Sequence, residues 1–182
     1  MTRALVIIDI QQDYFPGGAN PLVGPEAAAD AAARLLAHFR ARGEPVIHIQ
    51  HIWDAPDATF MRPGTPGFEI HPLVAPLPGE SLVQKEAPNA FLGTDLEKQL
   101  RDAELSDLVV VGMMSSMCVD ATVRAAADLG FGVTVAHDAC AAPNLEFNGA
   151  ALPGELVHAS FMAALADGYA QVVSSRELIE RS

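Results

Sequence analysis

The chain has 182 residues and a net charge of −12, half of its residues are hydrophobic and 19% are charged. This length suits one domain with a sizeable core, expected to span residues 1–182, and the composition excludes a disordered or fibrous protein. Lys and Arg do not cluster and no apolar run is long enough to cross a bilayer, which argues against nucleic-acid and membrane partners.

The apolar, β-branched run Arg3–Ile10 predicts the first strand, and it is too short and too polar at its end to be the core of a signal peptide. We therefore expect a cytoplasmic protein. A helix is predicted from Pro25 to Arg42, because Pro favours the first helical turn and Gly43 follows directly. The remaining elements are expected in this order: strand Pro45–Gln50, strand Ser81–Lys85, a helix opened by the capping box Thr94–Glu97 and ending near Leu105, strand Asp107–Gly112, helix Cys118–Leu129, strand Gly132–Ala136, helix Glu155–Ala166, strand Ala170–Val173 and a short helix within Ser174–Arg181.

Apolar strands that alternate with helices predict a parallel sheet covered on both faces. We expect a three-layer α/β/α sandwich with a central parallel sheet and right-handed crossovers, a Rossmann-like arrangement. Ligands in such sheets bind beyond the carboxyl ends of the strands, which selects the positions after Ile8, at Lys85 and after Gly112. The Pro- and Gly-rich stretch Asp54–Gly79 is predicted to be a long loop with a binding function.

Three side chains capable of chemistry lie at these positions. Asp9 ends an apolar strand, where a carboxylate needs a compensating partner, although a lone Asp there is more often a turn cap. Lys85 taken alone is most simply a surface lysine. Cys118 begins a predicted helix, whose free N–H groups favour a thiolate and can bind an oxyanion; a buried structural cysteine is an equally good interpretation of that segment. Together the three form a nucleophile with a base and an electrostatic partner.

Three sequence blocks resemble the isochorismatase-like cysteine hydrolases, a family that includes the nicotinamidases. The blocks are Ala4–Phe15, Lys85 with Asn89–Thr94, and Gly112–Thr122, and the resemblance covers essentially the whole chain. It implies that Asp9 is the base, Lys85 its electrostatic partner and Cys118 the nucleophile. It also implies a non-proline cis peptide before Met114, with the N–H groups of Met114 and Cys118 forming the oxyanion hole.

The resemblance is weaker at the metal site. Nicotinamidases bind a divalent metal through an Asp-x-His pair and a later His, whereas the matching stretch here is His48–Asp54, which lacks that pair. A site built from His51, Asp54 and His71 has suitable ligand types but the wrong spacing, and it stays an open alternative. The chain looks more like the metal-free branch of the family, so we expect neither a metal nor another cofactor.

Several further residues are candidates to contact a small-molecule substrate. Phe15 and Trp53 are favoured because they lie in predicted loops, and Asn89 can donate or accept a hydrogen bond. The other aromatic and apolar candidates are Phe91, Met114 and Met117, and for these as for Phe15 and Trp53 core packing is at least as good an explanation. His51, if it binds no metal, is expected to line the pocket or to orient a loop. Cys140 and His158 are expected to be core residues.

The expected reaction is cleavage of a carbon–nitrogen amide bond through a thioester on Cys118. Two alternatives remain open. True isochorismatases cleave a vinyl ether and need no thiol nucleophile, and a redox sensor or binding protein would have Cys118 oxidised rather than acylated. The resemblance also implies a homo-oligomer, a dimer or tetramer, and Ala-rich helix faces such as Ala125–Ala127 are candidates to pack against another subunit.

Overall fold

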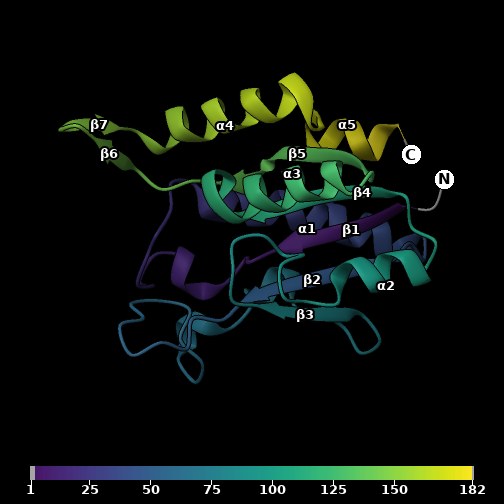
Figure 1. Cartoon of the computed structure of the whole chain (residues 1–182), viewed down its shortest axis with the longest axis horizontal. Coiled ribbons are helices and arrows are strands. Elements are labelled where there is room, and N and C mark those ends of the chain that lie inside the picture. The colour runs from purple at the N-terminus through teal and green to yellow at the C-terminus, as the bar shows by residue number, and fades with distance from the viewer. Residues whose placement is uncertain (1–2, 182) are drawn as a thin grey trace.

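The computed structural model describes residues 3–181, and its centre is one twisted parallel sheet (Figure 1). The strand order is β3-β2-β1-β4-β5-β8, so the chain begins in the middle of the sheet and builds outward in both directions. The strands are β1 (Arg3–Ile8), β2 (Val46–His51), β3 (Ser81–Lys85), β4 (Asp107–Met113), β5 (Gly132–Ala141) and β8 (Gln171–Val173).

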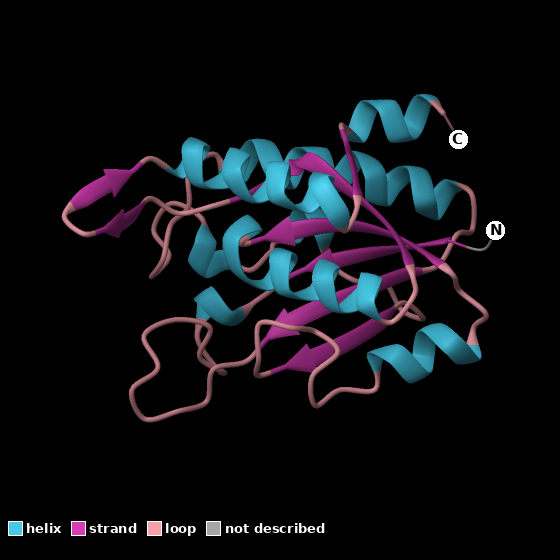
Figure 2. Ribbon diagram, turned by 45° about the horizontal axis from the view of Figure 1, so that its top comes forward, coloured by secondary structure: helices cyan, strands magenta, loops and turns pink. Residues whose placement is uncertain are grey.

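Helices cover both faces of the sheet, which confirms the predicted three-layer α/β/α sandwich (Figure 2). Successive side chains of β1 point to opposite faces, so Leu5 and Ile7 belong to one core while Val6 and Ile8 belong to the other. One core contains α1 (Pro25–Ala41) and α5 (Ser175–Glu180), and the other contains α2 (Leu96–Asp102), α3 (Asp120–Asp128) and α4 (Gly154–Gly168). None of the helices within residues 3–181 is long and apolar enough to cross a membrane.

The close pairing of β1 with the end of β4 depends on Gly112, which lies opposite Ile8. Gly112 has a φ of +135°, and a Cβ atom placed on it would lie 2.0 Å from the carbonyl oxygen of Ile8. Only glycine combines that backbone angle with so close an approach. The pairing of β4 with β5 changes register between Val110 and Gly112. β4 ends at the next residue, Met113, and the segment that follows carries Cys118 to the edge where Asp9 lies, since both contact Lys85 Nζ.

Several predicted boundaries are wrong. The capping box at Thr94 does not form: Thr94 donates to the carbonyl oxygen of Ala90 at 2.6 Å, and α2 begins one residue after its N-cap Asp95. The predicted end of that helix near Leu105 is also late, since α2 stops at Asp102. In contrast, β5 is longer than predicted and continues to Ala141.

A two-stranded hairpin follows β5 and was not predicted from the sequence. Strands β6 (Leu145–Phe147) and β7 (Ala150–Leu152) pair antiparallel and project from the body of the protein (Figures 1 and 2). Asn148 and Gly149 connect them with φ values of 51° and 76°. An Asn-Gly pair between two short apolar runs is a strong hairpin signal, so this element was detectable from the sequence.

Candidate active site

Asp9 lies directly after β1 in a conformation that few residues adopt. Its φ of 49° falls in the left-handed region, and its side chain is completely buried. The backbone N–H of Asp9 donates to the carbonyl oxygen of Ile49 at 3.1 Å, which ties the residue to β2. Strained backbone of this kind persists where the surrounding structure holds it, and it is frequent at functional sites.

Lys85 is the last residue of β3 and is not the surface residue that it resembles in isolation. Parallel pairing places it opposite His51, the last residue of β2, and only 2% of Lys85 is exposed. The ends of β1, β2 and β3 therefore bring Asp9, His51 and Lys85 to one edge of the sheet, as the rule for parallel sheets predicts.

Cys118 reaches the same edge from the segment that follows β4. The peptide bond between Met113 and Met114 is cis, at the position that the family resemblance implied. A π-helical turn then spans Ser115–Val119 and continues directly into α3. The Met114 carbonyl accepts from the N–H groups of Met117 at 3.0 Å and Val119 at 3.2 Å. Helical structure thus begins three residues before Cys118, rather than at Cys118 as the sequence predicted.

Lys85 is at the centre of the cluster. Its Nζ atom is 2.7 Å from Asp9 Oδ2, 2.9 Å from His51 Nδ1 and 3.3 Å from Cys118 Sγ. The contact with Asp9 is an ion pair that lacks hydrogen-bond geometry, so neither carboxylate oxygen has a hydrogen-bond partner among the described residues. Lys85 holds Oδ2, whereas Oδ1 lies away from this contact and has lone pairs that can accept a proton.

The surroundings of Cys118 favour the neutral thiol. Burial raises its pKa well above the usual range, and the carboxylate of Asp9 raises it further, while Lys85 acts in the opposite direction. Loss of solvent and the Asp9 charge outweigh the effect of Lys85, so the net shift is opposite to the thiolate that a helix start alone would favour. Cys118 can become a nucleophile when a base removes its proton, and Asp9 is the adjacent candidate.

His51 is neutral and acts as an acceptor toward Lys85. Its pKa is lowered by burial and then by the positive charge of Lys85, so Nδ1 keeps its lone pair. Gln11, which is fully buried, fixes the backbone of this residue: its Oε1 accepts from His51 N–H at 2.8 Å, and its Nε2 donates to His51 O at 3.1 Å. Gln11 was not among the predicted site residues, although a glutamine two residues after Asp9 in an apolar block is a visible signal.

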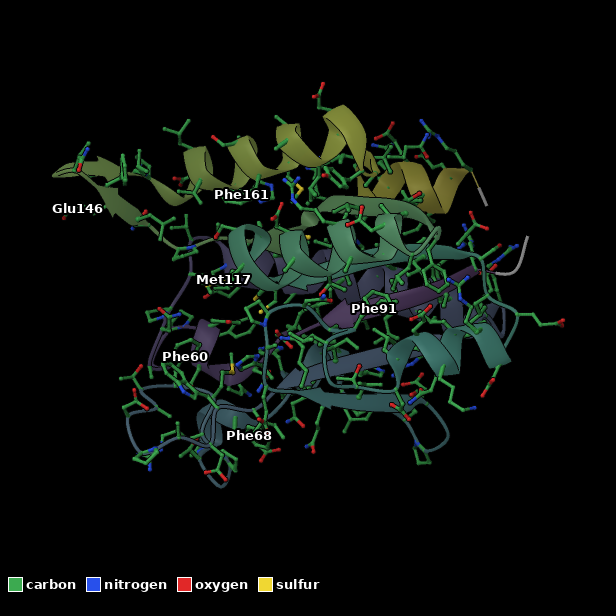
Figure 3. All side chains as sticks on the ribbon, viewed as in Figure 1. Phe60, Phe68, Phe91, Met117, Glu146 and Phe161 are labelled. Atoms are coloured by element: carbon green, nitrogen blue, oxygen red, sulfur yellow. The ribbon has the colours of Figure 1, made fainter. Side chains whose placement is uncertain are left out.

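A pocket of about 230 Å³ opens over Cys118. Phe60, from the long loop between β2 and β3, is central to its aromatic wall, with its ring centroid 5.3 Å from that of Trp53 and 6.1 Å from that of Tyr14. Figure 3 shows Phe60 and Met117 near each other at the edge where β1 and β2 end, with Phe91 away from them. The lining residues are Tyr14, His51, Trp53, Phe60, Glu86, Pro88, Met114, Met117 and Cys118.

Five of the predicted site residues therefore line this pocket, namely His51, Trp53, Met114, Met117 and Cys118. Three predicted substrate-binding residues do not. Phe15 stacks on His71 with centroids 4.1 Å apart, and Phe91 packs on Phe131 in the core on one face of the sheet. Asn89 accepts from the N–H of Phe91 at 2.9 Å and so supports a turn. The sequence missed Tyr14, Phe60, Glu86 and Pro88.

The alternative metal site does not assemble. Among the described residues one group of three has ligand atoms close enough to hold a metal, and it consists of Asp9, His51 and Cys118, with atoms within 4.8 Å of one another. Lys85 Nζ already contacts an atom of each, so an ammonium group neutralises this cluster and the residues do not fit a metal ion. Asp54 and His71 are not part of the group.

Cys140 and His158 lie outside the cluster. Cys140 is buried in β5, where burial raises its pKa to about 12 and its Sγ donates to the Ala136 carbonyl at 3.5 Å. His158 lies on α4, with its Nδ1 2.8 Å from the hydroxyl of buried Ser115. Cys140 is a core residue, as predicted. His158 is only partly buried and belongs to neither core, so that expectation is wrong for it, because α4 directs this side chain to Ser115 instead.

The comparisons with known sequences and with known structures point to the same family. A family profile described as "Isochorismatase domain" matches residues 3–176. The chain is 48% identical to the uncharacterised isochorismatase family protein YddQ of Bacillus subtilis, over 99% of this chain and 100% of that protein. It is 29% identical to the nicotinamidase of Escherichia coli, over 91% of this chain and 92% of that protein. A crystal structure of an isochorismatase-type hydrolase from Oleispira antarctica superposes with a TM-score of 0.95 at 52% identity, covering 98% of this chain and 96% of that one.

Proposed function

This chain belongs to the isochorismatase family of hydrolases, and we propose that it is a cysteine hydrolase that cleaves a carbon–nitrogen amide bond of a small molecule. The observation that carries the proposal is the position of Lys85 Nζ, 2.7 Å from Asp9 Oδ2 and 3.3 Å from Cys118 Sγ, beneath a pocket lined by Cys118. A nucleophile, a base and a fixed positive charge are the parts that covalent amide hydrolysis requires.

The first half of the reaction forms the acyl-enzyme. Asp9 takes the proton of the Cys118 thiol, and the resulting thiolate attacks the amide carbonyl carbon. Negative charge moves to the carbonyl oxygen, where the N–H groups of Met114 and Cys118 are the proposed donors. Asp9 then returns the proton to the leaving nitrogen as the carbon–nitrogen bond breaks, and a thioester to Cys118 remains.

The second half hydrolyses the thioester. Asp9, again an anion, takes a proton from a water molecule, and the hydroxide attacks the thioester carbonyl. The Cys118 thiolate leaves, the carboxylic acid is released, and the proton held by Asp9 returns to the thiolate. Each transfer is general acid–base catalysis, which contributes roughly 10²–10⁴ in rate. Lys85 keeps a positive charge beside Asp9 throughout the cycle.

The environment of Cys118 disfavours the sensor alternative. Redox-sensing cysteines have a low pKa and are exposed to solvent. Cys118 is 3% exposed, and burial together with Asp9 raises its pKa. The vinyl-ether alternative needs no thiol and leaves the contact between Lys85 and Cys118 unexplained.

The experiment is a screen of small amides for release of ammonia or amine, followed by variants on any substrate found. Cys118→Ala and Asp9→Asn are each expected to lower kcat by at least about 10³, because members of one catalytic unit are not additive. Cys140→Ala is the matched control, since it removes the other cysteine, and its kcat should stay within about threefold. Near-normal turnover by Cys118→Ala would overturn the proposal.

A small-molecule substrate fits a pocket of about 230 Å³. The cytoplasmic location, the homo-oligomeric assembly and the absence of nucleic-acid partners that the sequence predicts stay predictions.

A further inference from the structure

The walls of the pocket over Cys118 carry an unbalanced charge. Of the residues that line it, Glu86 is the one with a carboxyl group, no Lys or Arg is among them, and the pKa of His51 is lowered by burial. Glu86 is exposed and forms no ion pair with another described residue. Below Cys118, the charges of Asp9 and Lys85 offset each other.

The adjoining cavity does not change this balance. It measures about 670 Å³, shares Phe60 with the pocket, and is lined by Asp13 and Arg62, one charge of each sign. The carboxylate of Asp13 accepts from the backbone N–H groups of Ala19 and Met61. Glu86 therefore sets the sign of the charge around the pocket.

Aromatic rings supply the second feature. Tyr14, Trp53 and Phe60 line the pocket together, and Phe60 lies next to both of the other rings. The faces of aromatic rings attract cations, and several rings beside a carboxylate are the surroundings in which proteins hold ammonium groups. An anion placed there would lose its water without gaining a positively charged partner.

We propose that the pocket selects amides whose acyl part is apolar and neutral or carries an ammonium group, and disfavours those carrying a carboxylate, with Glu86 as the specificity-determining residue. This proposal rests on the proposed function, because it assigns the substrate class of the same site. A volume of about 230 Å³ limits the group that fills the pocket to less than the size of a typical drug molecule.

Cys118 itself can report the charge preference without a known substrate. Three methanethiosulfonates of similar size are used, one with a trimethylammonium group, one with a neutral hydroxyl and one with a sulfonate. In each, the cysteine sulfur attacks the sulfenyl sulfur, a mixed disulfide forms and a sulfinate leaves. Peptide mapping measures the rate at Cys118, and each rate is divided by that for N-acetylcysteine. The cationic reagent is expected to react at least about tenfold faster than the anionic one after this correction.

Variants assign the effect to Glu86. In Glu86→Gln, the ratio of the corrected labelling rates for the cationic and anionic reagents should fall to within about threefold of unity. In Glu86→Lys, the anionic reagent should react faster than the cationic one. Asp167→Lys makes the same change in net charge at an exposed site on α4 and should leave the ratio unchanged. The proposal is overturned if the wild-type ratio is near unity, or if Asp167→Lys changes it as much as Glu86→Lys does.

The same comparison with substrates separates the two proposals. Matched amides bearing an ammonium, a neutral or a carboxylate substituent are compared by kcat/KM. Cys118-dependent turnover without a charge preference would overturn this inference and leave the proposed function standing. A charge preference in labelling, with no Cys118-dependent turnover of any amide, would overturn the proposed function instead.

Discussion

The Nζ atom of Lys85 lies 2.7 Å from Oδ2 of Asp9, and both side chains are completely buried. Removing two charges from water is costly, and a buried ion pair is often no more stabilising than apolar residues of the same shape. A buried ion pair is therefore weak evidence of a stabilising role, and buried charges of this kind are frequent at functional sites. In a buried ion pair, removal of one charge leaves the other without compensation and lowers the free energy of unfolding.

This effect can be measured with Lys85→Met. The substitution leaves Asp9 buried without its partner, so the free energy of unfolding should fall by about 3–5 kcal/mol. The double variant Asp9→Asn/Lys85→Met removes both charges and should regain at least half of that loss, although it should not turn over substrate. Urea unfolding monitored by circular dichroism gives the values. A loss below about 1 kcal/mol in Lys85→Met would mean that the two charges are not coupled.

Reaction with iodoacetamide should separate thiol reactivity from catalysis. Cys118 lines a pocket whereas Cys140 is buried in β5, so Cys118 should be alkylated first, but more slowly than an ordinary thiol because its pKa is raised. Asp9 contributes to that increase, so Asp9→Asn should lower the pKa of Cys118, speed its alkylation at neutral pH by about tenfold, and still abolish turnover.

Peptide mapping after brief alkylation identifies the residue that reacts, and Cys118→Ala provides the background rate. If Cys140 were labelled first and activity fell with that label, the nucleophile would be assigned to the wrong cysteine. Slower alkylation of Asp9→Asn would show that Asp9 activates the resting thiol rather than opposing its ionisation.

Activity should not depend on a metal ion. The three side chains that come closest to forming a metal site, Asp9, His51 and Cys118, already contact Lys85 Nζ. We therefore expect full activity after prolonged exposure to EDTA and less than about 0.1 metal ion per chain by elemental analysis. Stoichiometric zinc or iron, with activity lost on chelation and restored by the metal, would contradict this prediction.

Glu80 should govern stability in acid. Its carboxylate accepts from Arg40 at 2.7 and 2.8 Å, from His48 Nε2 at 2.9 Å and from Leu77 N–H at 2.8 Å, and hydrogen bonding to Arg40 is the main reason its pKa falls from 4.5 to about 2. Because the folded-state pKa lies below the unfolded value, this stabilisation is complete above about pH 4.5 and is lost as the pH falls toward 2.

The matched variant is Glu80→Gln, which should lose about 1–3 kcal/mol at neutral pH. Its stability should also decline less between pH 4.5 and 2 than that of the wild-type protein, because residue 80 then has no carboxyl group to titrate. Urea unfolding across this pH range tests both expectations. If the free energy of unfolding fell equally with pH in the two proteins, titration of Glu80 would not contribute to the loss of stability in acid.

The edge that carries the candidate site could be predicted from sequence because Asp9 and Lys85 lie at strand ends and Cys118 follows one. Apolar runs mark where β1 and β4 finish, Ser81–Lys85 was predicted as a short strand, and a parallel sheet collects such ends on one side. The pocket walls follow no such rule. Phe15 and Tyr14 are adjacent aromatic residues in one short turn, and composition does not indicate which of them faces the pocket.

Phe60 shows why the rest of the pocket was missed. It lies in the loop between β2 and β3, which has no hydrophobic periodicity to interpret. Its position depends on contacts distant in sequence, such as the hydrogen bond of 2.6 Å from the N–H of Met61 to the buried carboxylate of Asp13. Phe91 was misplaced for a related reason: an aromatic residue near Lys85 in sequence packs on Phe131 instead.

The most direct test of the account is the mass of the protein during turnover. A small amide substrate is mixed with enzyme, the reaction is stopped with acid within one turnover, and intact and peptide masses are measured. The account predicts an added mass equal to the acyl group, located on Cys118, that appears and decays at rates consistent with kcat and is absent from Cys118→Ala. Full turnover with no acyl adduct, or with an adduct on another residue, would contradict it.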